Sequence, residues 1–167
     1  MRQNLLKTAV MILIVCIVAL GQTSEKSMRE KLTIKKALNL AVAKEIAATA
    51  EAEARKNNLS VSIAIVDEAG RLLYFQRMDD TTNASVEVAI AKAVHSANYR
   101  RDTKFHEDLL TKGNNVVLGL PNSLPVEGGV RLIVDEKVIG AIGVAGAQSP
   151  QDGQIAQAGA DLLSSKQ

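Results

Sequence analysis

The first strong periodic signal in the chain lies between residues 33 and 56. One large apolar residue recurs at every fourth position, namely Ile34, Leu38, Val42 and Ile46. This spacing lines one face of an α-helix. Thr33 stands immediately before the series, and its hydroxyl can accept a hydrogen bond from a free backbone N–H of the first turn. The pattern therefore predicts an amphipathic helix from Thr33 to about Lys56.

Two further segments have the pattern of antiparallel hairpins. Residues 61–66 alternate in hydropathy, Asp67 to Gly70 form a polar turn, and residues 71–78 return as a second strand. Near the other end of the chain, the acidic turn Asp135-Glu136-Lys137 joins two apolar runs, residues 130–134 and 138–146. Short apolar runs separated by such turns are typical of β-hairpins.

A second helix is predicted for residues 84–99, which contain no Gly or Pro and are rich in alanine. At about 100° per residue, its apolar side chains fall on two faces. One face carries Val86, Ile90, Ala93 and Ala97, and the other carries Ala84, Val88, Ala91, His95 and Tyr99. One face can pack on the sheet of the domain. The other needs more of the chain, a ligand or a second subunit to cover it.

Shorter elements complete the chain. Residues 105–112 favour a short helix ended by Gly113, residues 114–118 a third strand, and residues 154–163 a last helix. Pro121 and Pro125 mark a loop before the second hairpin. Adjacent hairpins with helices between them predict an α+β domain, in which helices pack on an antiparallel sheet.

The N-terminus has the layout of a secretory signal peptide over residues 1–21. Basic residues flank a polar start, Ala9 to Leu20 is uninterrupted apolar, and Ala19-Leu20-Gly21 fits a cleavage site. The alternative is an uncleaved membrane anchor, but this run is shorter than the about 20 residues that span a bilayer. We therefore expect a secreted or periplasmic protein, with a polar linker at residues 22–31 and a single domain at residues 32–165.

Removal of the leader changes the charge of the chain. Arg2 and Lys7 lie in the leader, so the mature chain carries 20 − 2 = 18 basic residues against 18 acidic residues. This balance gives no reason to expect nucleic acid or an anionic membrane as a partner. Cys16 is the only cysteine and lies in the leader. The mature protein is thus expected to have neither a disulfide nor thiolate chemistry.

Candidate chemistry centres on the only two histidines, His95 and His106. Several basic residues lie near them in the sequence: Lys92, Arg100, Arg101 and Lys104. Imidazoles beside cations suit a ligand with a metal at its centre and carboxylates at its edge. The alternative is that His95 packs against Tyr99, one helical turn away, and that the basic residues simply face solvent.

Other chemistries lack the residues that they need. Two histidines without a mature cysteine do not make a zinc site. There is also no nucleophile elbow and no phosphate-binding loop. Gly140, Gly143 and Gly146 lie within a strand, which favours close strand-to-helix packing over a dinucleotide fingerprint. Asp152 follows Pro150 and is expected to stabilise the start of the last helix.

Several of these segments, in this order, resemble the GlcG/HbpS-like haem-degrading domain family. They are residues 61–80, Ala91-Lys92-Ala93, Arg100-Arg101-Asp102-Thr103, Gly128-Gly129-Val130, residues 140–146 and Gln151-Asp152. The similarity covers about residues 32–163. It implies an α+β domain with a five-stranded antiparallel sheet and assembly into homo-oligomers. For some members it implies binding of haem, or of iron released from haem.

One departure from the family pattern bears on the ligand. Where the family has Lys-Ala-x-Thr-Ala, this chain has Lys92-Ala93-Val94-His95-Ser96, so His95 replaces a threonine. Either the iron site is strengthened here or the position tolerates change. The resemblance favours His95 as the axial haem ligand, with His106 or Thr103 as the second choice. Cationic side chains would then pair with the propionates, from Arg100, Arg101 or Lys104.

The function expected from this resemblance is an exported haem-binding protein that sequesters haem, with slow oxidative breakdown of haem as a further activity. The alternative is a non-catalytic accessory or scaffold protein that binds a protein partner or a small organic acid. No acid–base pair with defined spacing is visible. The residues therefore leave open whether the protein is an enzyme.

Overall fold

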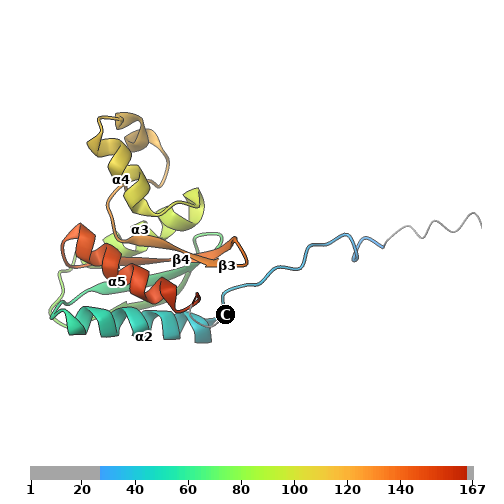
Figure 1. Cartoon of the computed structure of the whole chain (residues 1–167), viewed down its shortest axis with the longest axis horizontal. Coiled ribbons are helices and arrows are strands. Elements are labelled where there is room, and N and C mark those ends of the chain that lie inside the picture. The colour runs from blue at the N-terminus through green and yellow to red at the C-terminus, as the bar shows by residue number, and fades with distance from the viewer. Residues whose placement is uncertain (1–26, 165–167) are drawn as a thin grey trace, which may run out of the picture. The chain divides into compact units, whose positions relative to one another are not determined.

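The structure is a computed structural model that describes residues 27–164. The signal peptide predicted for residues 1–21 lies outside the described residues. The elements follow one another along residues 36–164, and Figure 1 shows their arrangement. They are α2 (Leu40–Lys56), β1 (Ser62–Asp67), β2 (Leu72–Arg77), α3 (Ser85–Tyr99), α4 (Thr103–Thr111), the 3-10 helix η1 (Asn115–Gly119), β3 (Gly129–Val134), β4 (Lys137–Ala145) and α5 (Ser149–Asp161).

The α+β class is confirmed, but the prediction of five strands is wrong for the described residues. The sheet has four strands in the order β2-β1-β4-β3, and all neighbours are antiparallel. Both predicted hairpins are present. Residues 114–118, predicted as a strand, lie mostly in η1, where Asn114 Oδ1 accepts a hydrogen bond from the backbone N–H of Val116 at 3.3 Å. This local bond favours a turn over an extended strand.

The first helix starts later than predicted. Helix α2 begins at Leu40, and the Oδ1 atom of Asn39 accepts a hydrogen bond from Val42 N–H at 2.9 Å. Thr33 is therefore not the cap. Ile34 is 95% exposed, so the four-residue spacing continues past the actual start of the helix. Asparagine is a stronger N-cap than threonine, which agrees with the start of α2 after Asn39 and not after Thr33.

The two faces of the sheet are covered differently. Helices α2 and α5 cover one face and enclose a core of large aliphatic side chains that includes Ile46, Ile63, Ile142, Val144 and Ile155. Helix α3 covers the other face through small residues. A Cβ atom at Gly143 would lie 2.0 Å from the carbonyl oxygen of Ala89 and 2.5 Å from the backbone nitrogen of Ala93. Close strand-to-helix packing, predicted from the glycine spacing, is confirmed at Gly143.

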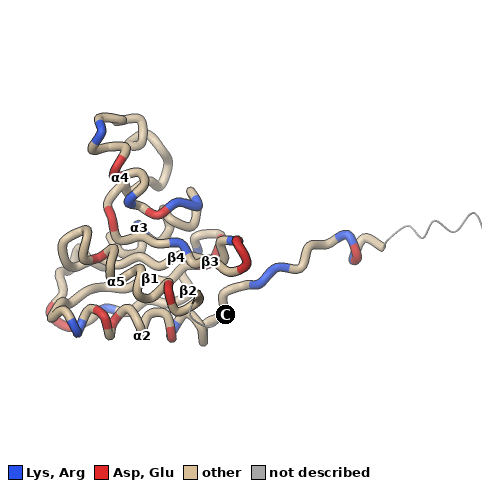
Figure 2. The backbone as a smooth tube through the Cα atoms, viewed as in Figure 1, with Lys and Arg blue, Asp and Glu red and all other residues tan. Residues whose placement is uncertain are grey.

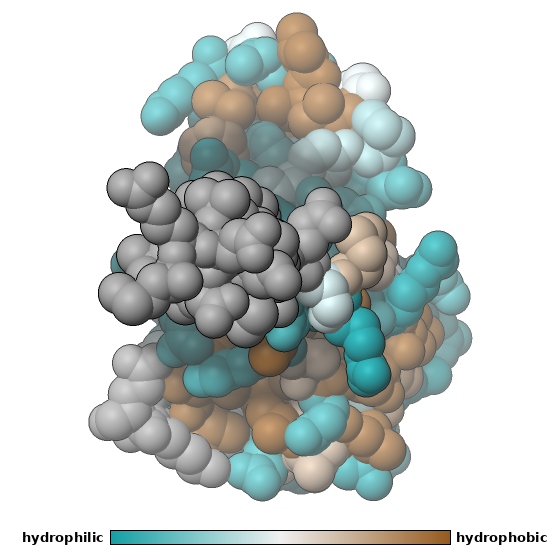
Figure 3. Space-filling model, turned by 90° about the vertical axis from the view of Figure 1, so that its right-hand side faces the viewer, coloured by the Kyte–Doolittle hydropathy of each residue, from teal (hydrophilic) through white to brown (hydrophobic). Residues whose placement is uncertain are grey.

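Residues 102–126, called the arm below, comprise α4, η1 and the loop that follows them. The arm stands away from the sheet in Figure 1. Apolar side chains are exposed on it, with Phe105 at 47%, Val116 at 77% and Leu118 at 62%. Figure 3 shows apolar residues at this end of the molecule. Across residues 27–164, no helix combines the length and the apolar character that a membrane crossing requires.

Candidate functional site

The two histidines meet at the junction of α3 and the arm. Helix α3 carries His95, which is fully buried, and α4 carries His106, which is 7% exposed. The Nε2 atom of His95 and the Nδ1 atom of His106 lie 2.8 Å apart, and the ring centroids are 4.8 Å apart. The fold thus joins two residues that are eleven positions apart in the sequence. They are called the histidine pair below.

A backbone donor fixes where the protons of the histidine pair lie. The N–H of Leu124 donates to His95 Nδ1 at 2.9 Å. Since that nitrogen accepts, a neutral His95 carries its proton on Nε2. It then donates to His106 Nδ1, and the proton of a neutral His106 must also lie on Nε2. Both rings are therefore Nε2–H tautomers.

Burial keeps the histidine pair neutral. Burial, together with a smaller effect of the nearby His106, lowers the pKa of His95 to about 4. The pKa of His106 is lowered too, first by burial and then by the positive charge of Arg101. At neutral pH neither ring is an imidazolium. Both imidazoles therefore have the neutral charge in which histidine binds a metal.

The outer nitrogen of His106 is the accessible part of the pair. Within residues 27–164, His106 Nε2 has no hydrogen-bond partner. Ser96 Oγ is the one described side-chain atom that is both fully buried and unpaired. His106 Nε2 must therefore be in contact with solvent. His95, by contrast, uses both of its ring nitrogens in hydrogen bonds to the protein.

Aromatic rings surround the histidine pair. The Tyr99 ring lies 5.1 Å from that of His95 and 5.4 Å from that of His106, and the Phe105 ring lies 5.2 Å from that of His106. The guanidinium of Arg101 stands over the Phe105 ring at 5.3 Å. This places an apolar ring and a cation side by side on the surface next to His106.

The other predicted site residues lie at the same junction but differ in their availability. Arg100 is exposed, with a left-handed backbone at φ 50°, and Lys104 forms an exposed ion pair with Asp108 at 2.8 Å. Charges of both signs therefore alternate where α4 begins, as Figure 2 shows. Thr103 is fully buried, and its hydroxyl accepts a hydrogen bond from Gly129 N–H at 2.9 Å. Its oxygen is thus occupied by β3.

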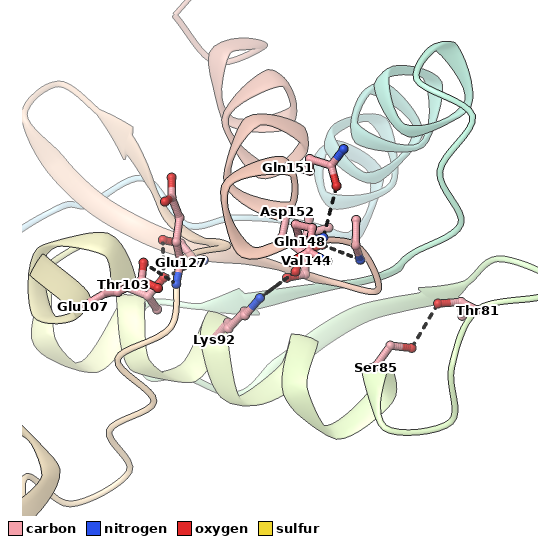
Figure 4. A network of polar contacts seen from close by, with 12 residues as sticks. Thr81, Ser85, Lys92, Thr103, Glu107, Glu127, Val144, Gln148, Gln151 and Asp152 are labelled. Atoms are coloured by element: carbon pink, nitrogen blue, oxygen red, sulfur yellow. Dashed lines mark hydrogen bonds and ion pairs between the residues drawn. The ribbon is translucent and has the colours of Figure 1, made fainter. Parts of the chain in front are cut away.

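Lys92 does not belong to this junction, in contrast to the grouping expected from the sequence. It is 1% exposed and faces the sheet, where its Nζ atom lies 2.8 Å from Asp152 Oδ2 and 3.0 Å from the carbonyl oxygen of Val144. Figure 4 shows this contact. Burial raises the pKa of Asp152, and its bond to Lys92 opposes the rise. Lys92 lies among alanines on the side of α3 that faces the sheet. A lysine in such a position indicates a buried ion pair, and this sequence signal could have predicted the contact with Asp152.

As predicted, Asp152 lies in the first turn of α5, where its charge favours the helix dipole, but its hydrogen bond is not to a backbone N–H of the helix. Its Oδ1 atom accepts a hydrogen bond from the backbone N–H of Ala147 at 3.0 Å, just before α5 begins. The same carboxylate therefore holds the segment between β4 and α5 and pairs with Lys92. At the start of α5 the N–H of Gln148 donates to the side chain of Gln151 at 3.1 Å. The sequence analysis placed Asp152 at the start of the last helix but missed its ion pair with Lys92 and its bond to Ala147.

The loop that ends the arm is held at three points. Tyr99 donates through its hydroxyl to the carbonyl oxygen of Pro121, Leu124 donates to His95, and Glu127 N–H donates to Glu107 at 3.1 Å. The sequence analysis missed Leu124 because it contributes a backbone N–H, a group that almost every residue type has.

Residues 27–164 contain no cluster of three or more His, Cys, Asp or Glu that could hold a metal ion. An apolar groove of about 310 Å³ lies elsewhere, between the start of α2 and the β3–β4 hairpin, and is lined by residues such as Val42, Val134 and Ile139. It contains none of the predicted site residues. The histidine pair and its surroundings are therefore the candidate site.

Comparisons with known proteins agree with this fold. Protein GlcG of Escherichia coli K12 is 40% identical over 107 residues, which is 64% of this chain and 80% of GlcG. The crystal structure of a double mutant of Streptomyces reticuli HbpS matches with a TM-score of 0.73 and 28% identity, covering 86% of this chain and 97% of that one. A PduOC:haem complex matches with a TM-score of 0.69 and 26% identity, covering 75% and 94%. The family described as haem-degrading protein HbpS-like matches residues 38–161, so this chain belongs to the HbpS-like family.

Proposed function

We propose that this protein binds and sequesters haem at the surface where α4 leaves α3. The observation that carries the proposal is the contact between His95 and His106, with the outer nitrogen of His106 facing solvent beside Arg101 and Phe105. Support also comes from the family and from a relative whose structure is a haem complex.

The residues at this junction fit the parts of haem. An imidazole is a common axial ligand of haem iron. Exposed cations at Arg100, Arg101 and Lys104 suit the propionates, and the half-exposed ring of Phe105 offers an apolar contact. Bound haem would supply the redox and oxygen chemistry. The chain would hold it, orient it and limit the access of water.

Within this proposal, His106 is the first choice for the axial ligand. Its Nε2 atom is in contact with solvent, whereas His95 is fully buried and bonded at both nitrogens. His95, the first choice from the sequence, then holds the ring of His106 through the hydrogen bond between them and does not bind the iron itself. Thr103 is the weakest choice because its hydroxyl is occupied by Gly129.

A haemin titration of the full chain, followed by absorbance, tests the proposal. We expect a saturable Soret band that His106→Ala abolishes, because the variant removes the ligand. Arg101→Gln should weaken binding, while Arg71→Gln, an exposed arginine in the β1–β2 turn, is the matched control. Binding that is equal in wild type and His106→Ala would contradict the assignment.

Export and haem breakdown are further parts of the proposal. The leader at residues 1–21 is expected to direct export, and intact-mass measurement of the protein from its producing cell should then give a chain starting at Gln22. A mass that includes Met1 would contradict cleavage. Breakdown predicts loss of the Soret band under oxygen and a reductant, faster for the wild-type complex than for free haemin.

The exposed arm favours a second candidate, an accessory protein or homo-oligomer that binds through this surface. Phe105, Val116 and Leu118 expose apolar side chains on the arm. Apolar groups gathered in this way are typical of protein contact sites. If the arm forms a homo-oligomer, Val116→Ser with Leu118→Ser should lower the particle mass measured by light scattering. If the wild-type protein is a monomer, the homo-oligomer is excluded, and the arm would then bind a different protein.

A further inference from the structure

All four ring nitrogens of the histidine pair are either protonated or accept a hydrogen bond. His95 Nδ1 accepts from Leu124, and His106 Nδ1 accepts from His95, so both protons lie on Nε2. Iron binds an imidazole through a nitrogen lone pair. Before either histidine can coordinate iron as a neutral imidazole, a ring proton must therefore move or a hydrogen bond to a ring nitrogen must break.

Coordination of iron at His106 Nε2 would change the protonation of both rings of the histidine pair. The proton of His106 leaves Nε2, and the ring must then carry a proton on Nδ1. Because Nδ1 faces His95 Nε2 at 2.8 Å, the proton between the two atoms passes to His106. His95 then takes a proton on Nδ1 from solvent. One proton leaves the pair and one enters it, so its charge does not change.

The proton on His95 Nδ1 would face a donor. Leu124 N–H lies 2.9 Å from this atom, and two N–H groups cannot share one hydrogen bond. The bond between Leu124 and His95 must break. Ser123 Oγ lies 3.5 Å from the same nitrogen and can accept a hydrogen bond from the new N–H.

Other modes of coordination lead to the same bond. Iron at His95 Nε2 also requires the proton to move to Nδ1, and iron at His95 Nδ1 displaces Leu124 directly. Only His106 Nδ1 would leave the bond with Leu124 in place. That atom lies against His95, which occupies the position that iron would need.

We infer that His95 is a positioning residue that couples iron coordination at His106 to the release of Leu124, so that ligand binding loosens the loop of residues 121–126 from α3. This inference rests on the proposed haem function and specifies how the site is regulated. Tyr99 and Glu107 hold the two ends of the loop through bonds that do not involve a histidine. The change is therefore confined to the middle of the loop.

The first test uses the full chain without ligand and with histidine labelled with 15N. Long-range proton–nitrogen NMR spectra report which nitrogen of each ring carries the proton. We expect the Nε2–H form for both His95 and His106. A proton on Nδ1 of either ring would overturn the inference, whatever the protein binds.

The second test adds gallium(III) protoporphyrin IX, a diamagnetic probe whose metal takes an axial ligand as haem iron does. We expect the two nitrogens of His95 to exchange their roles and the Leu124 amide to lose its protection from hydrogen exchange. The Glu127 amide, which bonds to Glu107, is the internal control and should not change. Metal-free protoporphyrin IX is the control for contact without coordination.

The outcomes separate the two proposals. If gallium protoporphyrin binds and His95 keeps its proton on Nε2, the coupling is refuted while haem binding stands. If it fails to bind, both the haem function and the coupling that depends on it are refuted. Inversion of His95 with gallium protoporphyrin, but not with the metal-free compound, supports the coupling.

Discussion

The buried ion pair between Lys92 and Asp152 gives a sharp test of the packing described here. The side chains are 1% and 3% exposed, and their charged atoms lie 2.8 Å apart. Lys92→Met keeps an unbranched chain of similar size and removes the charge. It leaves the Asp152 carboxylate with its bond to Ala147 but without a counter-ion, and Val144 loses a donor to its carbonyl oxygen.

Breaking a buried pair at one partner costs about 3–5 kcal/mol, mostly because an unpaired charge stays buried. We expect Lys92→Met to lose about this amount of unfolding free energy at pH 7. Adding Asp152→Asn removes the second charge and keeps an acceptor for Ala147. The double variant should therefore be more stable than Lys92→Met, by about 1–2 kcal/mol, since only neutral groups are left unpaired.

Urea unfolding followed by circular dichroism measures these changes, since the chain has no tryptophan for fluorescence. The cost of Lys92→Met should be smallest in acid and should grow as pH rises. Burial raises the pKa of Asp152, so the folded variant holds its proton to a higher pH than the unfolded chain. Equal or additive losses in the single and double variants would refute a coupled pair.

Three further predictions concern other parts of the fold. Ser96→Ala should raise stability by about 1 kcal/mol in urea unfolding, because it removes a buried hydroxyl without a partner; a loss would show that the hydroxyl is bonded. The lowered pKa values of His95 and His106 mean that the unfolded chain binds more protons between pH 6.5 and about 4. Stability should therefore fall by about 3 kcal/mol as pH drops through this window, and less in His95→Asn, a difference that calorimetry would detect. Gly143→Ala should cost about 3 kcal/mol because its Cβ would meet Ala89, and unchanged thermal unfolding would contradict the close packing.

The sequence predicted the parts of the fold that local patterns determine. The hairpins followed from alternation and polar turns, and the close packing at Gly143 followed from the glycine spacing. The start of α2 was misplaced because the periodic spacing continues past Asn39 to Ile34, although Leu38, which packs on the core, and Ile34, which is exposed, both precede the helix. The strand predicted at residues 114–118 failed because no neighbouring strand pairs with it, which depends on the tertiary fold.

The candidate site was predictable in residue type but not in geometry. His95 and His106 were selected as the only imidazoles in the chain, and the fold brings them to 2.8 Å. Their protonation depends on Leu124, which acts through its backbone. Lys92 was grouped with the histidines by sequence proximity, but the helical rotation turns it toward Asp152. Sequence distance alone could not separate these two faces of α3.

The most direct test of the account is pulsed electron paramagnetic resonance of the ferric haem complex, prepared with histidine labelled with 15N. The chain has only two histidines, so a signal from labelled nitrogen at the iron identifies this pair. We predict nitrogen modulation that changes on labelling and is absent in His106→Ala. A saturated haem complex whose spectrum is insensitive to the label would contradict haem binding through the histidine pair.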